Sequence, residues 1–155
     1  MANQFVHLHL HSEYSLLDST LRLKPLIAET RKRGMAAIAL TDQSNLFAMV
    51  KMFRAATASG VKPIFGADVW IHHPQRKDSL SRLVLLCQDD IGYLNLKRLV
   101  SRSYLEGQLG DRPTINIEWL KGASEGLIAL SACLEGDIGQ ALKMHNVPLA
   151  IDCLE

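Results

Sequence analysis

The sequence predicts an α/β fold, in which a mainly parallel sheet is covered by outer helices. Short apolar segments alternate along the chain with longer segments whose apolar residues recur at helical spacing. The middle strand candidates are uninterrupted apolar runs, as expected when both faces of a sheet are covered. With 155 residues, the chain has the size of one domain, and neither a linker nor a repeat divides it. We therefore expect a single domain over residues 1–155.

The first half of the chain reads as three strands and two helices. "FVHLHL" alternates apolar and polar residues like a strand, and "LKPLIAETRKRG" has helical spacing, a basic last turn and Gly34 as a stop. "AAIAL" is a short buried strand, and "KPIFGADVWI" is a third strand. Between these two, "NLFAMVKMFRAATASG" is predicted to be a helix that Asn45 opens and Gly60 closes.

The second half continues the alternation. "RLVLLCQ" and "GLIALSA" are strand candidates, and "DIGYLNLKRLVSRSYLEG" is a helix between them, followed by a short helix over residues 117–121. "MHNVPLAIDCLE" reads as a turn and the start of another helix. A closed βα barrel needs more strands than this, so we expect the chain to be part of a longer one.

Composition limits the classes of function. Hydrophobic residues make up 48% of the chain and charged residues 21%, and no apolar run is long enough to span a membrane. No signal peptide is evident and the three cysteines show no CxxC spacing, so we expect reduced thiols and a cytoplasmic protein. A net charge of +1 produces no global field for nucleic acid, and the local basic runs are typical of solvated helix faces.

Candidate ligands for a metal ion follow from the expected strand ends. On a strand, His7, His9 and His11 share one face, and two histidines two residues apart can converge on one ion. Functional residues collect where parallel strands end. On that rule the further candidates are Asp18, Asp42, Asp68 and Cys133.

Structural roles remain open for the histidines, Asp18, Asp42 and Cys133. The histidines could form the hydrogen-bonded polar face of a strand. Asp18 could be a turn residue and Asp42 a helix-opening residue. Cys133 could be a small buried side chain.

Five blocks of the sequence resemble one family. They are "FVHLHLHSEYSLLDS", "ALTDQSNLFAMVKMF", "GVKPIFGADV", "GYLNLKRLVSRSYLEG" and "EGLIALSACLEGDIG". Together and in this order they resemble the polymerase and histidinol phosphatase (PHP) domain at the N-terminus of bacterial DNA polymerase III alpha subunits. The resemblance implies a PHP-type distorted βα barrel, of which this chain is the N-terminal part, without the polymerase domains.

The resemblance also implies a metal site, which this chain matches incompletely. The metal-binding positions of the family correspond to His9, His11, Asp18 and Cys133. Asp68 stands where the family has Glu, Gln43 where it has a histidine after "TD", and Arg82 where it has another histidine. An amide is a poor substitute for imidazole, and a guanidinium repels a cation. We therefore expect a degraded site, in which Arg82 pairs with Asp18, Asp42 or Asp68.

Several functions follow as expectations from the resemblance. The first is a structural and docking domain that binds a proofreading exonuclease subunit within a replicative polymerase. The full-length protein would contact the sliding clamp and DNA and use magnesium. The second is a metal-dependent 3′–5′ exonuclease or phosphoesterase, with zinc or manganese at the residual site. The third, a separate histidinol phosphatase, is disfavoured by "GYLNLKRLVSRSYLEG", which resembles the polymerase family.

Overall fold

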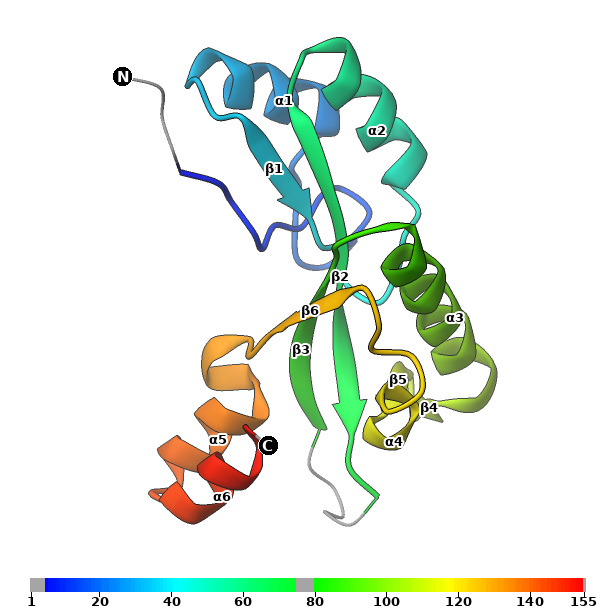
Figure 1. Ribbon diagram of the computed structural model, residues 1–155, viewed down its shortest axis with the longest axis vertical. Helices are drawn as coiled ribbons and strands as arrows, with labels where there is room; N and C mark the ends of the chain where they lie inside the picture. The colour runs from blue at the N-terminus through cyan, green and yellow to red at the C-terminus, as the bar shows by residue number, and fades with distance from the viewer. Residues whose placement is uncertain (1–4, 75–79, 155) are drawn as a thin grey trace.

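Two long antiparallel strands, β2 (Lys62–His72) and β3 (Leu80–Cys87), form the middle of the molecule. Figure 1 shows this computed structural model, which describes residues 5–74 and 80–154. β2 is longer than its neighbours, so its first residues pair with β1 (Ala37–Leu40) and its later residues with β3. The predicted α/β class is confirmed.

The sheet is mixed, which corrects the expectation of a mainly parallel one. Its strands follow the order β4–β5–β2–β3–β6, with β1 beside the first half of β2. β1 and β5 (Arg112–Asn116) run parallel to β2, whereas β3 and β6 (Leu127–Leu130) form an antiparallel meander with it. β4 (Gln108–Leu109) is antiparallel to β5. β3 runs antiparallel to β2 because the connection between them, residues 73–79, is too short for the crossover that parallel strands require.

Helices cover the sheet in three groups. α1 (Leu23–Lys32) and α2 (Met49–Ala58) pack on β1 around Ile27, Leu40 and Met52. α3 (Asp90–Glu106) covers β2 and β3, and the short α4 (Ile117–Leu120) follows β5. A 3₁₀ turn, η1 (Cys133–Glu135), leads into α5 (Asp137–Lys143) and α6 (Val147–Asp152). α5 and α6 lie on the opposite side of the central strands from α3 (Figure 1).

Most predicted elements are found where the sequence placed them. α1 ends as expected, with Arg31 and Lys32 in its last turn and Gly34 at φ +70° just beyond. β1, β2, β3, α3, α4, β6 and the start of α6 also match their predicted segments. β4, β5, η1 and α5 were not predicted. No helix in the described residues is long and apolar enough to cross a bilayer.

The prediction that "FVHLHL" forms a regular strand is wrong. Its residues lie beside β1, where the Ala39 amide donates to His7 O and the Thr41 amide to Leu10 O, both at 2.8 Å. The donors are two residues apart, but the acceptors are three apart. One extra residue therefore bulges out of the pairing and breaks the regular ladder.

The predicted start of the second helix is also wrong. Asn45 does not begin α2, because residues 45–46 are irregular and residues 47–48 form a turn before the helix begins at Met49. The Asn45 carboxamide accepts from the Phe47 amide at 3.2 Å and donates to Tyr14 O and Gln43 O. Its side chain therefore connects two loops near the candidate site instead of capping the helix.

Candidate functional site

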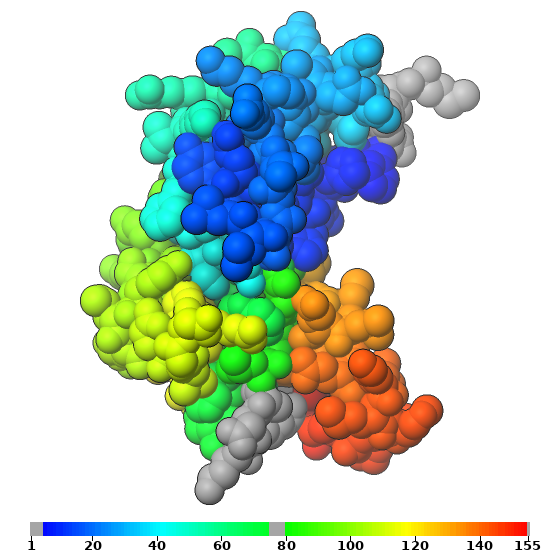
Figure 2. Space-filling view, turned by 180° about the vertical axis from the view of Figure 1, so that it is seen from behind, coloured from blue at the N-terminus to red at the C-terminus, as the bar shows by residue number. Residues whose placement is uncertain are grey.

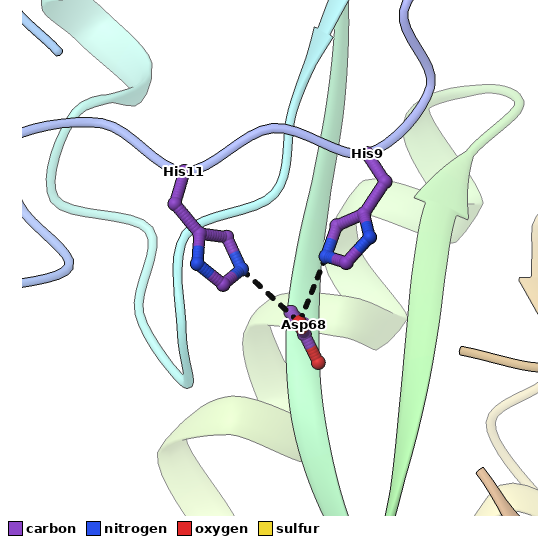
Figure 3. Close-up of side chains that lie close together, drawn as sticks. All are labelled: His9, His11 and Asp68. Carbon is purple, nitrogen blue, oxygen red and sulfur yellow. Dashed lines mark hydrogen bonds and ion pairs between the residues drawn. The ribbon is translucent and has the colours of Figure 1, made fainter. Parts of the chain in front are cut away.

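Two histidines and one buried aspartate form the centre of the candidate site. His9 and His11 belong to the bulged N-terminal segment, and Asp68 lies in the middle of β2 (Figure 3). The Nε2 atoms of His9 and His11 lie 2.9 Å and 3.1 Å from the same oxygen, Asp68 Oδ2. The Asp68 side chain is only 1% exposed, and that of His9 is 48% exposed. The site therefore extends from a buried carboxylate to an imidazole that is partly exposed at the surface.

Arg82 from β3 pairs with the same carboxylate. Its Nη2 donates to Asp68 Oδ2 at 2.6 Å and its Nε to Asp68 Oδ1 at 3.1 Å. In the register of β2 and β3, Trp70 is opposite Arg82 and Asp68 opposite Val84, so both charged side chains leave the same face of the sheet. The expected pairing of Arg82 with a carboxylate of the site is confirmed, and the partner is Asp68.

The pKa values of the two partners shift as an ion pair requires. Burial alone would raise the pKa of Asp68, but hydrogen bonds from His11, Arg82 and His9 and the charge of Arg82 hold it below its ordinary value. Burial opposes the charge on Arg82 as well, yet Asp68 and then Glu135 raise the pKa of the guanidinium. Both groups therefore stay ionised at neutral pH.

Asp18 lies at the edge of the group. Its Oδ2 is 3.6 Å from His11 Nδ1, on the side of the imidazole ring away from Asp68. With its amide oriented to satisfy both neighbours, Gln43 donates to Asp18 Oδ2 at 2.9 Å and accepts from Trp70 Nε1 at 3.1 Å. Gln43 thus holds Asp18 by a hydrogen bond where a histidine could have bound a metal ion.

Asp42 is buried and has structural contacts. Its carboxylate accepts from the Ser12 amide at 2.6 Å, from Ser12 Oγ at 2.7 Å and from Ser15 Oγ at 2.8 Å. These bonds fix the loop after His11 against the end of β1. Asp42 therefore positions the histidine segment, and both serine hydroxyls donate to it.

Cys133 and its neighbours lie on the Arg82 side of the site. Cys133 is exposed in η1 and is not grouped with the histidines. Two residues later, Glu135 Oε2 lies 3.0 Å from Arg82 Nη1. Sequence reasoning missed Glu135, because it is 53 residues from Arg82 and no spacing rule connects them. It also missed Trp70, whose ring lies 5.2 Å from the Arg82 guanidinium carbon.

The three ligand atoms of the site suit a metal ion, but the positive charge beside them does not. Within the described residues, His9, His11 and Asp68 offer three ligand atoms within 4.8 Å of one another, and nitrogen and oxygen donors of this kind suit zinc or manganese. However, Arg82 already donates to the Asp68 oxygen that would be the ligand. A guanidinium keeps its charge and repels a cation. The residues therefore do not fit a bound metal as they stand.

Comparison with known proteins identifies the family. The family model "PHP domain" matches residues 7–155. DNA polymerase III subunit alpha of Pseudomonas aeruginosa is 49% identical over 142 residues, which are 92% of this chain and 12% of that protein. The Vibrio cholerae subunit is 40% identical over 152 residues, or 98% of this chain and 13% of that protein. The chain thus spans about an eighth of these relatives.

A solved structure supports the fold. A Bifidobacterium adolescentis protein assigned to the metal-dependent phosphoesterases superposes with a TM-score of 0.52 at 17% identity, covering 66% of this chain and 34% of that one. At this identity the likeness concerns the fold, which is consistent with a partial distorted barrel. With the family match over nearly its whole length, the chain belongs to the PHP domain family.

Proposed function

We propose that this chain is the PHP portion of the alpha subunit of a bacterial replicative DNA polymerase, and that it supports and docks other parts of that polymerase. The similarity to alpha subunits of DNA polymerase III over 92–98% of the chain supports this context. In the proposal, the full-length protein synthesises DNA with magnesium and contacts DNA and the sliding clamp. The chain itself contributes no catalytic step and docks the proofreading exonuclease subunit.

One observation carries the structural part of the proposal. The Arg82 guanidinium makes two hydrogen bonds to Asp68 and one to Glu135, at 2.6 to 3.1 Å. The pair lies in a largely buried position, where the Arg82 side chain is 12% exposed. A fixed positive charge there joins β2, β3 and η1 through charge-assisted hydrogen bonds. We infer that Arg82 replaces a metal ion as the cross-link of this centre.

Metal analysis tests this inference. The purified chain is dialysed against zinc or manganese, desalted and measured by plasma mass spectrometry, with His9→Ala as the control. We expect well under one equivalent of metal in the wild-type chain and no change in the control. One equivalent that is lost in His9→Ala would contradict the proposal.

A second function, a metal-dependent 3′–5′ exonuclease or phosphoesterase, is favoured by the convergence of His9, His11 and Asp68. Arg82→Ala removes the competing charge and leaves these three ligands in place. A nuclease assay with single-stranded DNA and manganese, run on wild-type and Arg82→Ala chains, separates the two functions. Wild-type activity that disappears in His11→Ala would establish the second function. Activity in neither chain is expected if the domain is structural.

The exposed apolar side chains of two neighbouring loops are our candidate docking surface for the exonuclease subunit. Leu16 and Leu17 are 87% and 99% exposed, and Phe47 is 72% exposed. The hydrogen bond from Asn45 to Tyr14 O connects the two loops that carry these residues. Exposed large apolar side chains that cluster are typical of interaction sites.

The docking test uses the full-length alpha subunit and the purified exonuclease subunit. Leu16→Asp combined with Leu17→Asp is expected to weaken binding about tenfold or more, since buried apolar anchors dominate interfaces. Leu105→Asp is the matched control, because Leu105 is 82% exposed on α3. Surface plasmon resonance that shows equal affinity for the loop variant and the control would exclude this surface.

A further inference from the structure

α3 carries apolar side chains on two of its faces. Its inward face packs on β2 and β3 through Leu96 and Leu99, which are buried. On its other side, Ile91, Leu94 and Leu105 are 49%, 39% and 82% exposed. Figure 2 shows the yellow-green atoms of this part of the chain at the outer surface of the molecule, beside the green central strands. The helix therefore presents a second apolar face to solvent.

The exposed apolar residues of α3 belong to one regular series. Ile91, Leu94, Arg98, Ser101 and Leu105 follow one another at intervals of three, four, three and four residues. These are the intervals of positions a and d in a coiled coil, so the five side chains lie along one line of the helix. At 1.5 Å per residue this line, which we call the outer seam of α3, is about 21 Å long. Its spacing suits packing against a second helix.

The middle of the outer seam is positively charged. Arg98 and the preceding Lys97 are exposed, and neither forms an ion pair with another residue that the structure describes. Arg102, one turn later, differs from them. Its Nε donates to Glu106 at 2.7 Å, and its guanidinium carbon lies 4.0 Å from the centre of the Trp119 ring. The charges of Arg98 and Lys97 are therefore left for an acidic partner to compensate.

A second copy of this chain does not suit the outer seam. Arg98 lies seven residues from Ile91 and seven from Leu105, so it is the midpoint of the seam. Two seams that paired in register would place Arg98 against Arg98, whether the helices ran parallel or antiparallel. Like charges in contact disfavour such a pairing. A partner with Asp or Glu at the facing position would instead form a pair of opposite charges.

Nucleic acid does not suit the seam either. A phosphate backbone is bound chiefly by lysine and arginine, but three of the five seam residues are apolar. Removing these side chains from water requires an apolar surface on the partner. A protein helix with apolar residues on one face and an acidic residue among them supplies both properties.

We propose that the outer seam of α3 docks an amphipathic helix of a partner protein, with apolar residues facing Ile91, Leu94 and Leu105 and an acidic residue facing Arg98. The seam shares no residue with the Asp68 site or with the candidate surface for the exonuclease subunit, so this contact goes beyond the proposed function. α3 is 17 residues long and is fixed by its buried face. The docking surface is therefore preformed, which lowers the entropic cost of binding.

Fluorescence anisotropy with two synthetic peptides on the 155-residue chain tests the proposal. Both are labelled amphipathic helices of about 20 residues with leucine at positions a and d. They differ only at the central position a, which is Glu in one and Lys in the other. We expect the Glu peptide to bind the wild-type chain about tenfold more tightly, and Arg98→Glu to reverse this preference. Leu94→Ser combined with Leu105→Ser should weaken binding of both peptides about tenfold.

Arg54→Glu is the matched control, because Arg54 is also exposed on a helix, α2, outside the seam. It should keep the wild-type preference for the Glu peptide. A labelled single-stranded DNA oligonucleotide is the third probe. Equal binding of the two peptides, or a preference that survives in Arg98→Glu, would overturn the proposal. So would DNA that binds more tightly than the Glu peptide and is released by Arg98→Glu, or a dimer of the chain that Leu94→Ser combined with Leu105→Ser dissociates.

Discussion

Asp42 is the residue whose removal should destabilise the site most. It is fully buried and accepts three hydrogen bonds from Ser12 and Ser15. Asp42→Ala leaves these donors without their acceptor, and each unsatisfied buried group costs about 1–3 kcal/mol. We expect the free energy of unfolding to fall by about 3 kcal/mol or more, as measured by urea denaturation. Asp111→Ala, at an exposed turn, should change it by less than about 0.5 kcal/mol.

The pH dependence of stability should report the Asp68 ion pair. The pKa of Asp68 in the folded chain lies below its ordinary value of 3.8. The ionised form is therefore favoured by folding, and the stabilisation is present above that value and is lost as the pH falls through the folded pKa. The Asp68→Asn variant cannot ionise. Its carboxamide accepts through one oxygen only, so its NH₂ group cannot replace the second carboxylate oxygen in the hydrogen bonds with His9, His11 and Arg82.

Urea denaturation of the wild-type and Asp68→Asn chains at a series of pH values measures this effect. Near pH 7 the variant should be less stable by about 2 kcal/mol, the usual contribution of hydrogen bonds to a charged group. The difference between the two chains should shrink as the pH falls below about 4. A difference that stays constant from pH 7 to pH 3 would show that the charge of Asp68 does not stabilise the fold.

At the scale of single residues, the sequence predicted which residues belong to the site better than it predicted the partners that they contact. His9, His11 and Asp68 were candidates and do converge. The position of Arg82 near a carboxylate was also predictable, because a lone guanidinium in such a site needs an acceptor. The hydrogen bond between His73 and Asp137 could not be predicted from the sequence. The two are 64 residues apart, so only the tertiary fold brings them together.

At the scale of elements, α3 depends on a close approach that only glycine allows. A Cβ on Gly92 would lie 1.8 Å from the carbonyl oxygen of Gly126, in the turn before β6. Gly92→Ala should therefore push α3 away from this turn and destabilise the chain by about 2 kcal/mol or more, as overpacking does. Gly122→Ala is the control, since nothing lies within 4 Å of its added Cβ. Equal midpoints in thermal unfolding would contradict the close approach.

The elements that sequence periodicity defined well are those with a buried face. α1, α3 and β2 were found because apolar residues recur along them at the helical or strand spacing. "FVHLHL" also alternates, yet the bulge between His7 and Leu10 breaks its pairing. The direction of β3 relative to β2 depends on the short connection between them. Periodicity alone cannot show either feature, because both are properties of strand pairing and not of one segment.

At the scale of the whole molecule, one face of the sheet remains open. A hollow of 680 Å³ lies between α2, α3 and β6, and its lining includes Phe53, Phe65, Leu86 and Ile128. Phe53 is 53% exposed and Ile128 is 42% exposed. In the described chain, β6 pairs with β3 on one edge and with no strand on the other. A free strand edge beside an exposed apolar surface favours pairing with another chain.

We therefore expect the isolated chain to self-associate at micromolar concentrations through this open face. Size-exclusion chromatography with light scattering over a dilution series should show a mass that rises with concentration. Ile128→Lys and Phe53→Lys place charges in the hollow and should shift the chain toward monomer by about tenfold in concentration, since burying an unpaired charge is costly. Leu105→Lys, on the exposed part of α3, should behave like the wild-type chain. A monomer that persists at every concentration would show that the open face does not bind a second copy, and an effect of Leu105→Lys equal to that of Ile128→Lys would move the contact away from the hollow.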